Sequence, residues 1–100
     1  MGRKNSKNND LLSSVRKDTS PKIYSILVDL VNDDREDLAE IVLKIDYLLQ
    51  YTSACINHKD FDEARESIRK VEDRIKILEK EEKNIDYLIY IYEGIKSKCK

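Results

Sequence analysis

The segment "INHKDFDEAR", residues 56–65, separates two stretches in which apolar residues recur with helical spacing. Asn57 and His58 suit the end of one helix. Asp60 suits the cap of the next helix, with Glu63 three residues further on in the position of a capping box. The segment therefore predicts a turn near residues 57–60 that joins two helices.

Apolar residues on both sides of this turn follow alternating steps of three and four, the spacing of a coiled-coil seam. Downstream, the seam is Phe61, Ala64, Ile68, Val71, Ile75, Leu78, Glu82, Ile85, Ile89 and Tyr92. Upstream, it runs back through Cys55, Thr52, Leu48, Ile45, Ile41, Leu38, Asp34, Val31, Leu27 and Tyr24. Folding the chain at the turn pairs the two seams. The sequence thus predicts an all-α, antiparallel coiled-coil helical hairpin with two long helices, over about 21–57 and 60–94.

The outer ends of this hairpin also carry helix-boundary residues. Ser20 and Pro21 suit the N-cap and first position of the first helix, and Gly94 suits the stop of the second. We expect residues 20–100 to form the hairpin domain, preceded by a flexible basic arm over 1–19 in which residues 10–17 have the spacing of a short helix.

The segment "VNDDRED", residues 31–37, is the weakest part of the first helix, because Asn and Asp favour caps and turns. A break at 32–34 gives the alternative fold, a three-helix bundle. The heptad phase continues through the segment without a skip, which favours one continuous helix. In that case Asp34 would face Glu82 in the single wholly charged layer of the seam.

Composition agrees with a small helical protein. The chain has 100 residues, 40% hydrophobic and 39% charged, with two Gly and one Pro. One domain of long, water-facing helices fits these values better than a β-fold, which needs frequent turn residues. Two cysteines make no disulfide framework and no signal peptide is evident, so we expect a reducing, cytoplasmic location.

Catalytic, cofactor-binding and metal-binding patterns do not emerge from the sequence. One His and no Gly-rich phosphate loop make an enzyme improbable, and we expect a non-enzymatic protein without cofactor. Cys55 and His58 have the spacing of half a zinc site. The hairpin would place the other cysteine, Cys99, about 50 Å away at the opposite end, so no metal site is expected.

Apolar residues outside the seam indicate a protein interface at the end of the hairpin distal to the turn. The expected interface residues are Ile23, Ile26, Val28, Leu30, Tyr87, Leu88, Tyr90, Ile91 and Ile95. A patch of this size exposed to water normally marks a binding surface. We expect it to join two copies into a dimeric four-helix bundle, or to accept a helical segment of another protein.

The N-terminal arm offers two further hypotheses. Residues 1–22 hold six basic and two acidic residues, a local charge of +4 in a chain of net charge −1. Nucleic acid or a membrane surface would be contacted by Arg3, Lys4, Lys7, Arg16 and Lys17. Gly2 and Ser6 match the pattern for N-myristoylation, which would anchor the chain to a membrane.

The leading functional hypothesis is therefore a helical-hairpin interaction and oligomerisation module that acts as an adaptor or assembly subunit. The first alternative is a small dimeric regulator that binds nucleic acid through its basic arm. The second is an N-myristoylated peripheral membrane scaffold.

Overall fold

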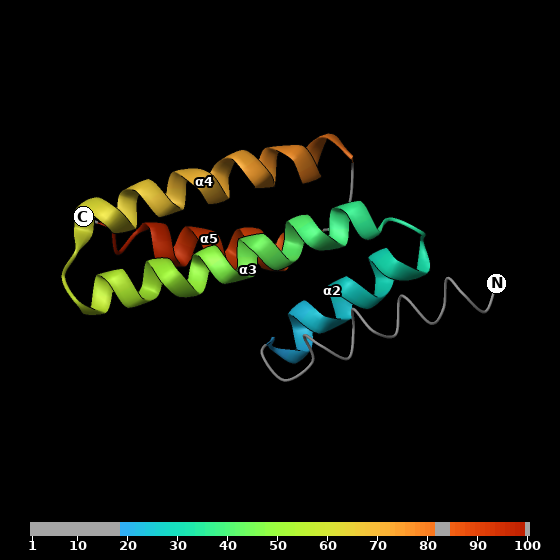
Figure 1. The fold of residues 1–100 in the computed structure, drawn as a ribbon, viewed down its shortest axis with the longest axis horizontal. Helices are drawn as coiled ribbons and strands as arrows, with labels where there is room; N and C mark the ends of the chain where they lie inside the picture. The colour runs from blue at the N-terminus through green and yellow to red at the C-terminus, as the bar shows by residue number, and fades with distance from the viewer. Residues whose placement is uncertain (1–18, 82–84, 100) are drawn as a thin grey trace. The chain divides into compact units, whose positions relative to one another are not determined.

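The structure is a computed structural model that describes residues 19–81 and 85–99. This part of the chain contains helices and no strand: α2 (Pro21–Asn32), α3 (Glu36–Asn57), α4 (Phe61–Lys80) and α5 (Asp86–Lys96) (Figure 1). The all-α class is confirmed, whereas the prediction of two long helices is wrong. Contacts divide the chain into two compact units, Met1–Leu43 and Lys44–Lys100.

In the first unit, α2 begins where the sequence predicts. The Ser20 hydroxyl accepts a hydrogen bond from the Ile23 amide at 3.2 Å, and Pro21 occupies the first helical position. The helix buries Ile23, Leu27, Leu30 and Val31 on one side, at the three- and four-residue spacing of an amphipathic helix.

The predicted continuity of the first helix through residues 32–34 is wrong, and the alternative break is confirmed. After Asn32 the chain turns at Asp34, whose φ of 62° is left-handed. The Asp34 amide donates to the Val31 carbonyl at 3.0 Å, and the Arg35 amide to the Leu30 carbonyl at 2.8 Å. This pair of bonds is a Schellman motif, which satisfies the last carbonyls of α2. Asp34 lies in this turn and not within a helix, so it does not form the expected charged layer of the seam; Glu82 lies outside the described residues.

In the second unit, the turn predicted near 57–60 is confirmed. It repeats the same motif at Lys59, with a φ of 61°. The Lys59 amide donates to the Ile56 carbonyl at 2.9 Å, and the Asp60 amide to the Cys55 carbonyl at 2.8 Å. The Asp60 carboxylate then caps α4 by accepting a hydrogen bond from the Glu63 amide at 3.4 Å.

The left-handed conformation of Lys59 raises the free energy of the folded state, because its Cβ crowds the following carbonyl in this conformation. Lys59→Gly should therefore raise the free energy of unfolding by about 1 kcal/mol, as measured by urea denaturation. Lys59→Ala keeps the Cβ and removes the rest of the side chain, so it should change little. Equal effects from the two variants would show that the backbone conformation is not the cause.

Buried polar contacts fix the register of the last turns of α3 against α4. The hydroxyls of Thr52 and Ser67 lie 2.9 Å apart, and both reach the Leu48 carbonyl, at 2.7 and 3.3 Å. Thr52 is 0% exposed and Ser67 3%. Tyr51 contacts Glu63 and Leu48 contacts Ser67, so residue numbers fall along α3 as they rise along α4, and the two segments are antiparallel. Around them, Ile45, Leu48, Cys55, Ala64, Ile68 and Val71 are buried, as the seam predicts.

A second break interrupts the predicted helix over 60–94. The first part, α4, ends at Lys80, and α5 begins at Asp86. Gly94 does not stop the helix, because α5 continues to Lys96. Tyr92 donates to Glu72, and Arg65 donates to the Cys99 carbonyl at 3.4 Å. As residue numbers rise along α5 they fall along α4, so the two helices are antiparallel.

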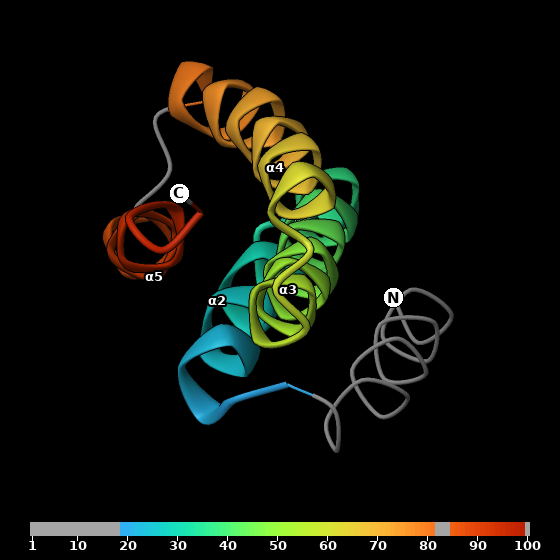
Figure 2. The same ribbon diagram turned by 90° about the vertical axis from the view of Figure 1, so that its left-hand side faces the viewer.

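This reversal returns the C-terminus to the α3–α4 turn, and both face the viewer in Figure 2. The expected separation of about 50 Å between Cys55 and Cys99 is therefore wrong. The physical reason lies in the apolar residues of 85–95. A straight continuation of α4 would leave many of them in water, whereas the reversal buries Ile85 and Leu88. The basic arm over 1–19 lies almost wholly outside the described residues, as does the short helix suggested over 10–17.

Candidate functional site

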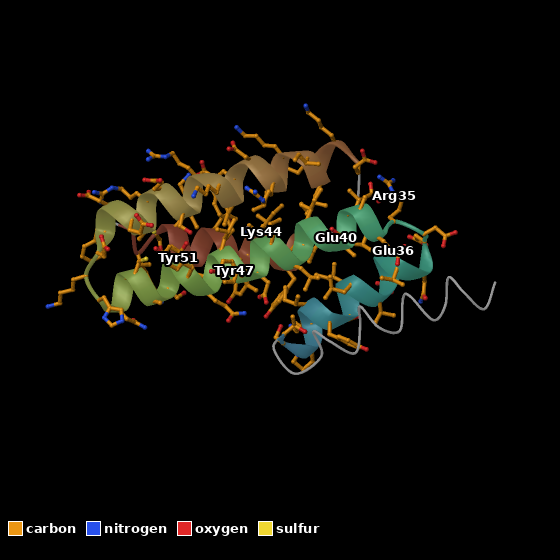
Figure 3. All side chains as sticks on the ribbon, in the orientation of Figure 1. Arg35, Glu36, Glu40, Lys44, Tyr47 and Tyr51 are labelled. Carbon is orange, nitrogen blue, oxygen red and sulfur yellow. The ribbon has the colours of Figure 1, made fainter. Side chains whose placement is uncertain are left out.

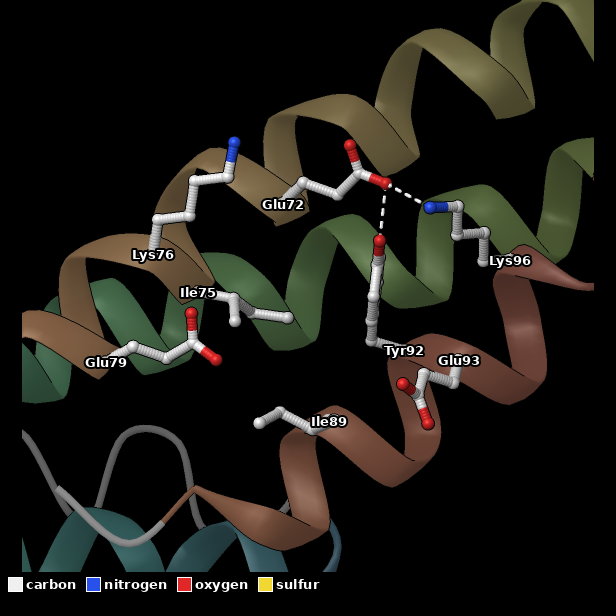
Figure 4. A pocket seen from close by; sticks show the side chains of 8 residues that line it. All are labelled: Glu72, Ile75, Lys76, Glu79, Ile89, Tyr92, Glu93 and Lys96. Atoms are coloured by element: carbon white, nitrogen blue, oxygen red, sulfur yellow. Dashed lines mark hydrogen bonds and ion pairs between the residues drawn. The ribbon is translucent and has the colours of Figure 1, made fainter. Parts of the chain in front are cut away.

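Antiparallel packing of α4 and α5 leaves a pocket of about 360 Å3 between them (Figure 4). We call it the α4–α5 pocket; it is lined by Glu72, Ile75, Lys76, Glu79, Ile89, Tyr92, Glu93 and Lys96. Ile75 and Ile89 face each other across it from the two helices. The lining is thus two isoleucines and an aromatic ring bordered by charges of both signs.

One ionic cluster fastens α5 to α4 at the edge of this pocket. The Glu72 carboxylate accepts a hydrogen bond from the Tyr92 hydroxyl and lies 2.8 Å from the Lys96 ammonium (Figure 4). The Lys96 ammonium also lies 5.5 Å from the centroid of the Tyr92 ring, within the range of a cation–π contact. Three side chains from two helices therefore stabilise one another.

The cluster shifts the ionisation of its members in the directions that these contacts require. Lys96 and then Tyr92 hold the pKa of Glu72 below its ordinary value of 4.5. The Glu72 carboxylate, followed by Tyr92, raises the pKa of Lys96. Burial, and then the Glu72 carboxylate, raises the pKa of the Tyr92 phenol. The cluster accordingly favours an ionised Glu72, a charged Lys96 and a neutral Tyr92.

Glu72→Gln should lower the free energy of unfolding at neutral pH by about 1 kcal/mol, because the hydrogen bond from Tyr92 and the solvent-screened contact with Lys96 are both weakened. Since the folded pKa of Glu72 is depressed, its contribution is present above the ordinary value of 4.5 and is lost as pH falls through the folded value. The variant should therefore lose less stability on acidification than the wild type. Urea denaturation at a series of pH values measures both effects.

The matched control is Glu66→Gln, which changes an exposed carboxylate on the same helix. It should have little effect at neutral pH. If Glu72→Gln and Glu66→Gln behave alike at every pH, the cluster does not hold α5 against α4.

The opposite side of α5 presents a second concavity, which we call the outer face of α5. It is a hollow of about 530 Å3 lined by Tyr90, Ile91, Glu93, Gly94, Ile95 and Lys98. Tyr90 is 75% exposed, more than any other large hydrophobic residue in the described part of the chain. Ile91 and Ile95 are half-buried. An apolar surface of this kind on a short helix is typical of a binding surface.

Gly94 lies in the middle of this face and inside the helix. A Cβ added at Gly94 would meet no atom within 4 Å, so nothing in the described packing requires a glycine. Glycine in a helix costs about 1 kcal/mol relative to alanine. Because glycine has no side chain, the backbone of another helix can approach the α5 backbone closely at this position.

The structure distributes the nine predicted interface residues over two units. Ile23 and Leu30 on α2, and Leu88 on α5, are buried, at 1%, 4% and 0% exposure. Ile26, Val28, Tyr87, Ile91 and Ile95 are half-buried, and Tyr90 is exposed. Tyr90, Ile91 and Ile95 come together on the outer face of α5, whereas the α2 members belong to the first unit.

Sequence reasoning missed an aromatic stripe along α3 (Figure 3). Tyr47 is 60% exposed and Tyr51 40% exposed, whereas the residues that follow them, Leu48 and Thr52, are buried. The Lys44 ammonium lies 5.3 Å from the Tyr47 ring centroid. The Tyr51 hydroxyl donates to Glu63 at 2.7 Å, and this carboxylate raises the pKa of Tyr51. The sequence does contain a sign of this stripe, because Tyr47 and Tyr51 are four residues apart and lie outside the seam.

The remaining predicted residues bear on other chemistry. Gly2, Arg3, Lys4, Lys7, Arg16 and Lys17 lie outside the described residues, so nucleic-acid contact and lipidation stay predictions. Cys55 is buried and His58 is exposed. Within residues 19–81 and 85–99, no three His, Cys, Asp or Glu side chains gather as metal ligands. None of the helices described is long and apolar enough to cross a membrane.

Comparison with known proteins gives no family for this chain. No protein-family model matches it, and neither a curated protein nor a solved structure matches it.

Proposed function

We propose that this chain is a non-enzymatic helical interaction module that self-associates through the outer face of α5 and acts as an assembly subunit or adaptor. The observation that carries this proposal is Tyr90, which is 75% exposed beside a hollow that Ile91, Gly94 and Ile95 also line. A large aromatic side chain beside a low backbone position is the kind of anchor that dominates helix-mediated binding.

The face is chemically self-complementary, which favours a second copy as the occupant. Tyr90 and Lys98 line the same hollow, and Gly94 lies midway between them in sequence. In a two-fold antiparallel pair centred on Gly94, Tyr90 of each copy would lie against Lys98 of the other. Such a pair gains two cation–π contacts and lets the two backbones approach at the glycines.

The size of the face sets the expected affinity. The helix α5 has 11 residues, and one side of it is smaller than the roughly 800 Å2 per partner of a standard protein interface. We therefore expect weak association, with a Kd in the micromolar range or above. This also replaces the broader two-helix patch expected from sequence, since Ile23, Leu30 and Leu88 are already buried within the chain.

Sedimentation equilibrium of the wild type, from low micromolar to near-millimolar concentration, tests the proposal. The apparent mass should rise with concentration from that of the monomer, 11.8 kDa, toward twice that value. A constant mass of 11.8 kDa across the whole range would contradict self-association.

A further inference from the structure

The two cysteines converge on one end of the second unit. Cys55 lies in the last turn of α3, and its carbonyl accepts the Asp60 amide of the turn at 2.8 Å. Cys99 follows the end of α5, and its carbonyl accepts Arg65, in the second turn of α4, at 3.4 Å. The turn and the C-terminus lie at the same end of the ribbon (Figures 1 and 2).

Both side chains point into protein rather than water. Cys55 is 7% exposed and Cys99 6%, although Cys99 lies beyond the last residue of α5. The Cys99 thiol lies 3.5 Å from the Ile95 carbonyl, which accepts its hydrogen. Burial raises the pKa of Cys99, the Arg65 guanidinium lowers it, and the neighbouring Cys55 raises it further. The hydrogen bond from Arg65 places Cys99 beside the second turn of α4, at the end of the second unit that also holds Cys55.

We propose that Cys55 and Cys99 are a modification site: a low-molecular-weight disulfide such as oxidised glutathione converts them to an intramolecular disulfide that fastens the end of α5 to the α3–α4 turn. Nothing in this proposal depends on self-association. It depends on the reversal of the chain between α4 and α5, which brings residue 99 back to residue 65.

The chemistry takes place in two exchanges. The Cys99 thiolate attacks one sulfur of oxidised glutathione, a mixed disulfide forms, and one glutathione leaves as its thiolate, which takes up the proton that Cys99 lost. The Cys55 thiolate then attacks the Cys99 sulfur, and the second glutathione leaves and is protonated in the same way. Two protein thiols are oxidised by two electrons, and one oxidised glutathione is reduced to two glutathiones.

Cys99 is the residue that reacts first, because it lies beyond Lys96, the last residue of α5, and a segment outside a helix opens locally at lower cost in free energy than one within it. Cys55 is held within α3 and is covered in the folded state. When the segment after α5 closes again, it delivers the mixed disulfide to Cys55. The resulting loop covers residues 55–99, which is 99 − 55 + 1 = 45 residues. A cross-link over that length typically raises the midpoint of thermal unfolding by on the order of 10 °C.

The test is equilibration of the full chain with glutathione redox buffers, in native buffer and in concentrated urea. Acid quenching and a maleimide of high mass count the free thiols on a non-reducing gel. The ratio of protein disulfide to protein dithiol is measured at each ratio of oxidised to reduced glutathione. The equilibrium constant of this exchange gives the effective concentration of the Cys55 thiol at the Cys99 thiol. Folding that holds Cys99 near Cys55 should make this concentration at least tenfold higher in native buffer than in urea. A ratio of one or less would overturn the proposal.

Single variants identify the bond. In the wild type, the oxidised product should be a monomer that binds no maleimide, whereas Cys55→Ser and Cys99→Ser should each stop at the mixed disulfide with glutathione. A wild type that forms only disulfide-linked dimers, or only mixed disulfides at both cysteines, would also overturn the proposal. Because the readout is covalent, it distinguishes this outcome from a failure of self-association.

Discussion

Replacing Leu88 by alanine should lower the free energy of unfolding by about 2–5 kcal/mol, the range for removing a large side chain from a packed core. Leu88 is 0% exposed, and it is the residue of α5 whose burial is most complete. The truncation removes buried apolar atoms and leaves a cavity, and both effects favour the unfolded chain. Urea denaturation followed by circular dichroism, at a concentration well below that of self-association, measures the loss.

Tyr90→Ala is the matched control, because Tyr90 lies two residues further along the same helix and is 75% exposed. Exposed substitutions of this kind usually change stability by less than about 0.5 kcal/mol. Equal losses from Leu88→Ala and Tyr90→Ala would show that α5 does not turn its Leu88 side inward.

The assignment of Leu88 to an interface illustrates the limit of the sequence for this helix. Residues 85–95 are apolar nearly all round, so the helical period identifies which residues share a side and not which side is inward. That choice depends on the reversal between Lys80 and Asp86. No Gly or Pro marks this reversal, and the heptad pattern continues across it, which is why a continuous helix was predicted.

Local capping was predictable where a side chain makes a specific hydrogen bond. Ser20 and Asp60 both cap the helices that the sequence assigned to them. The sequence marks the break after Asn32 less clearly, because the left-handed position of its Schellman motif is Asp34 rather than the usual glycine. The intact heptad phase favoured continuity there, and the capping tendency of Asn and Asp prevailed.

The sequence predicts which segment carries the candidate site, but not which of its side chains are exposed or which residues they contact. Surplus apolar residues pointed to 85–95, and Tyr90, Ile91 and Ile95 do lie together on one face. The Glu72–Tyr92–Lys96 cluster joins residues up to 24 positions apart, since 96 − 72 = 24, and depends wholly on the antiparallel packing of α5. The exposure of Tyr47 and Tyr51 likewise follows from which side of α3 is buried.

Tyr90→Lys should weaken self-association more than about thirtyfold, the effect of losing an anchor residue worth at least 2 kcal/mol. The substitution removes the exposed aromatic ring from the hollow and places a second ammonium group against Lys98 of the other copy. Sedimentation equilibrium at matched concentrations gives the two dissociation constants.

Gly94→Ala also tests whether the outer face of α5 is the interface, by adding a methyl group to it. Its Cβ meets nothing within 4 Å, so the variant should raise the free energy of unfolding of the monomer by about 1 kcal/mol. It should nevertheless weaken association, because the methyl group separates the two backbones. The control is the pair Glu66→Ala and Lys70→Ala, both exposed on α4, which should leave association unchanged. If both Tyr90→Lys and Gly94→Ala associate as tightly as the wild type, the outer face of α5 is not the interface.

The folding of α5 back along α4 underlies the core role of Leu88, the outward position of Tyr90 and the approach of the two cysteines. It is tested most directly by the distance between spin labels at His58→Cys and Lys98→Cys, two exposed positions, in a chain that also carries Cys55→Ser and Cys99→Ser. Dilution with unlabelled chain removes distances between copies. The reversal predicts one population at well under half of 55 Å, whereas an unbroken helix from residue 61 to residue 98 would separate the labels by about 55 Å at 1.5 Å per residue. A distribution centred near that longer distance would contradict the account.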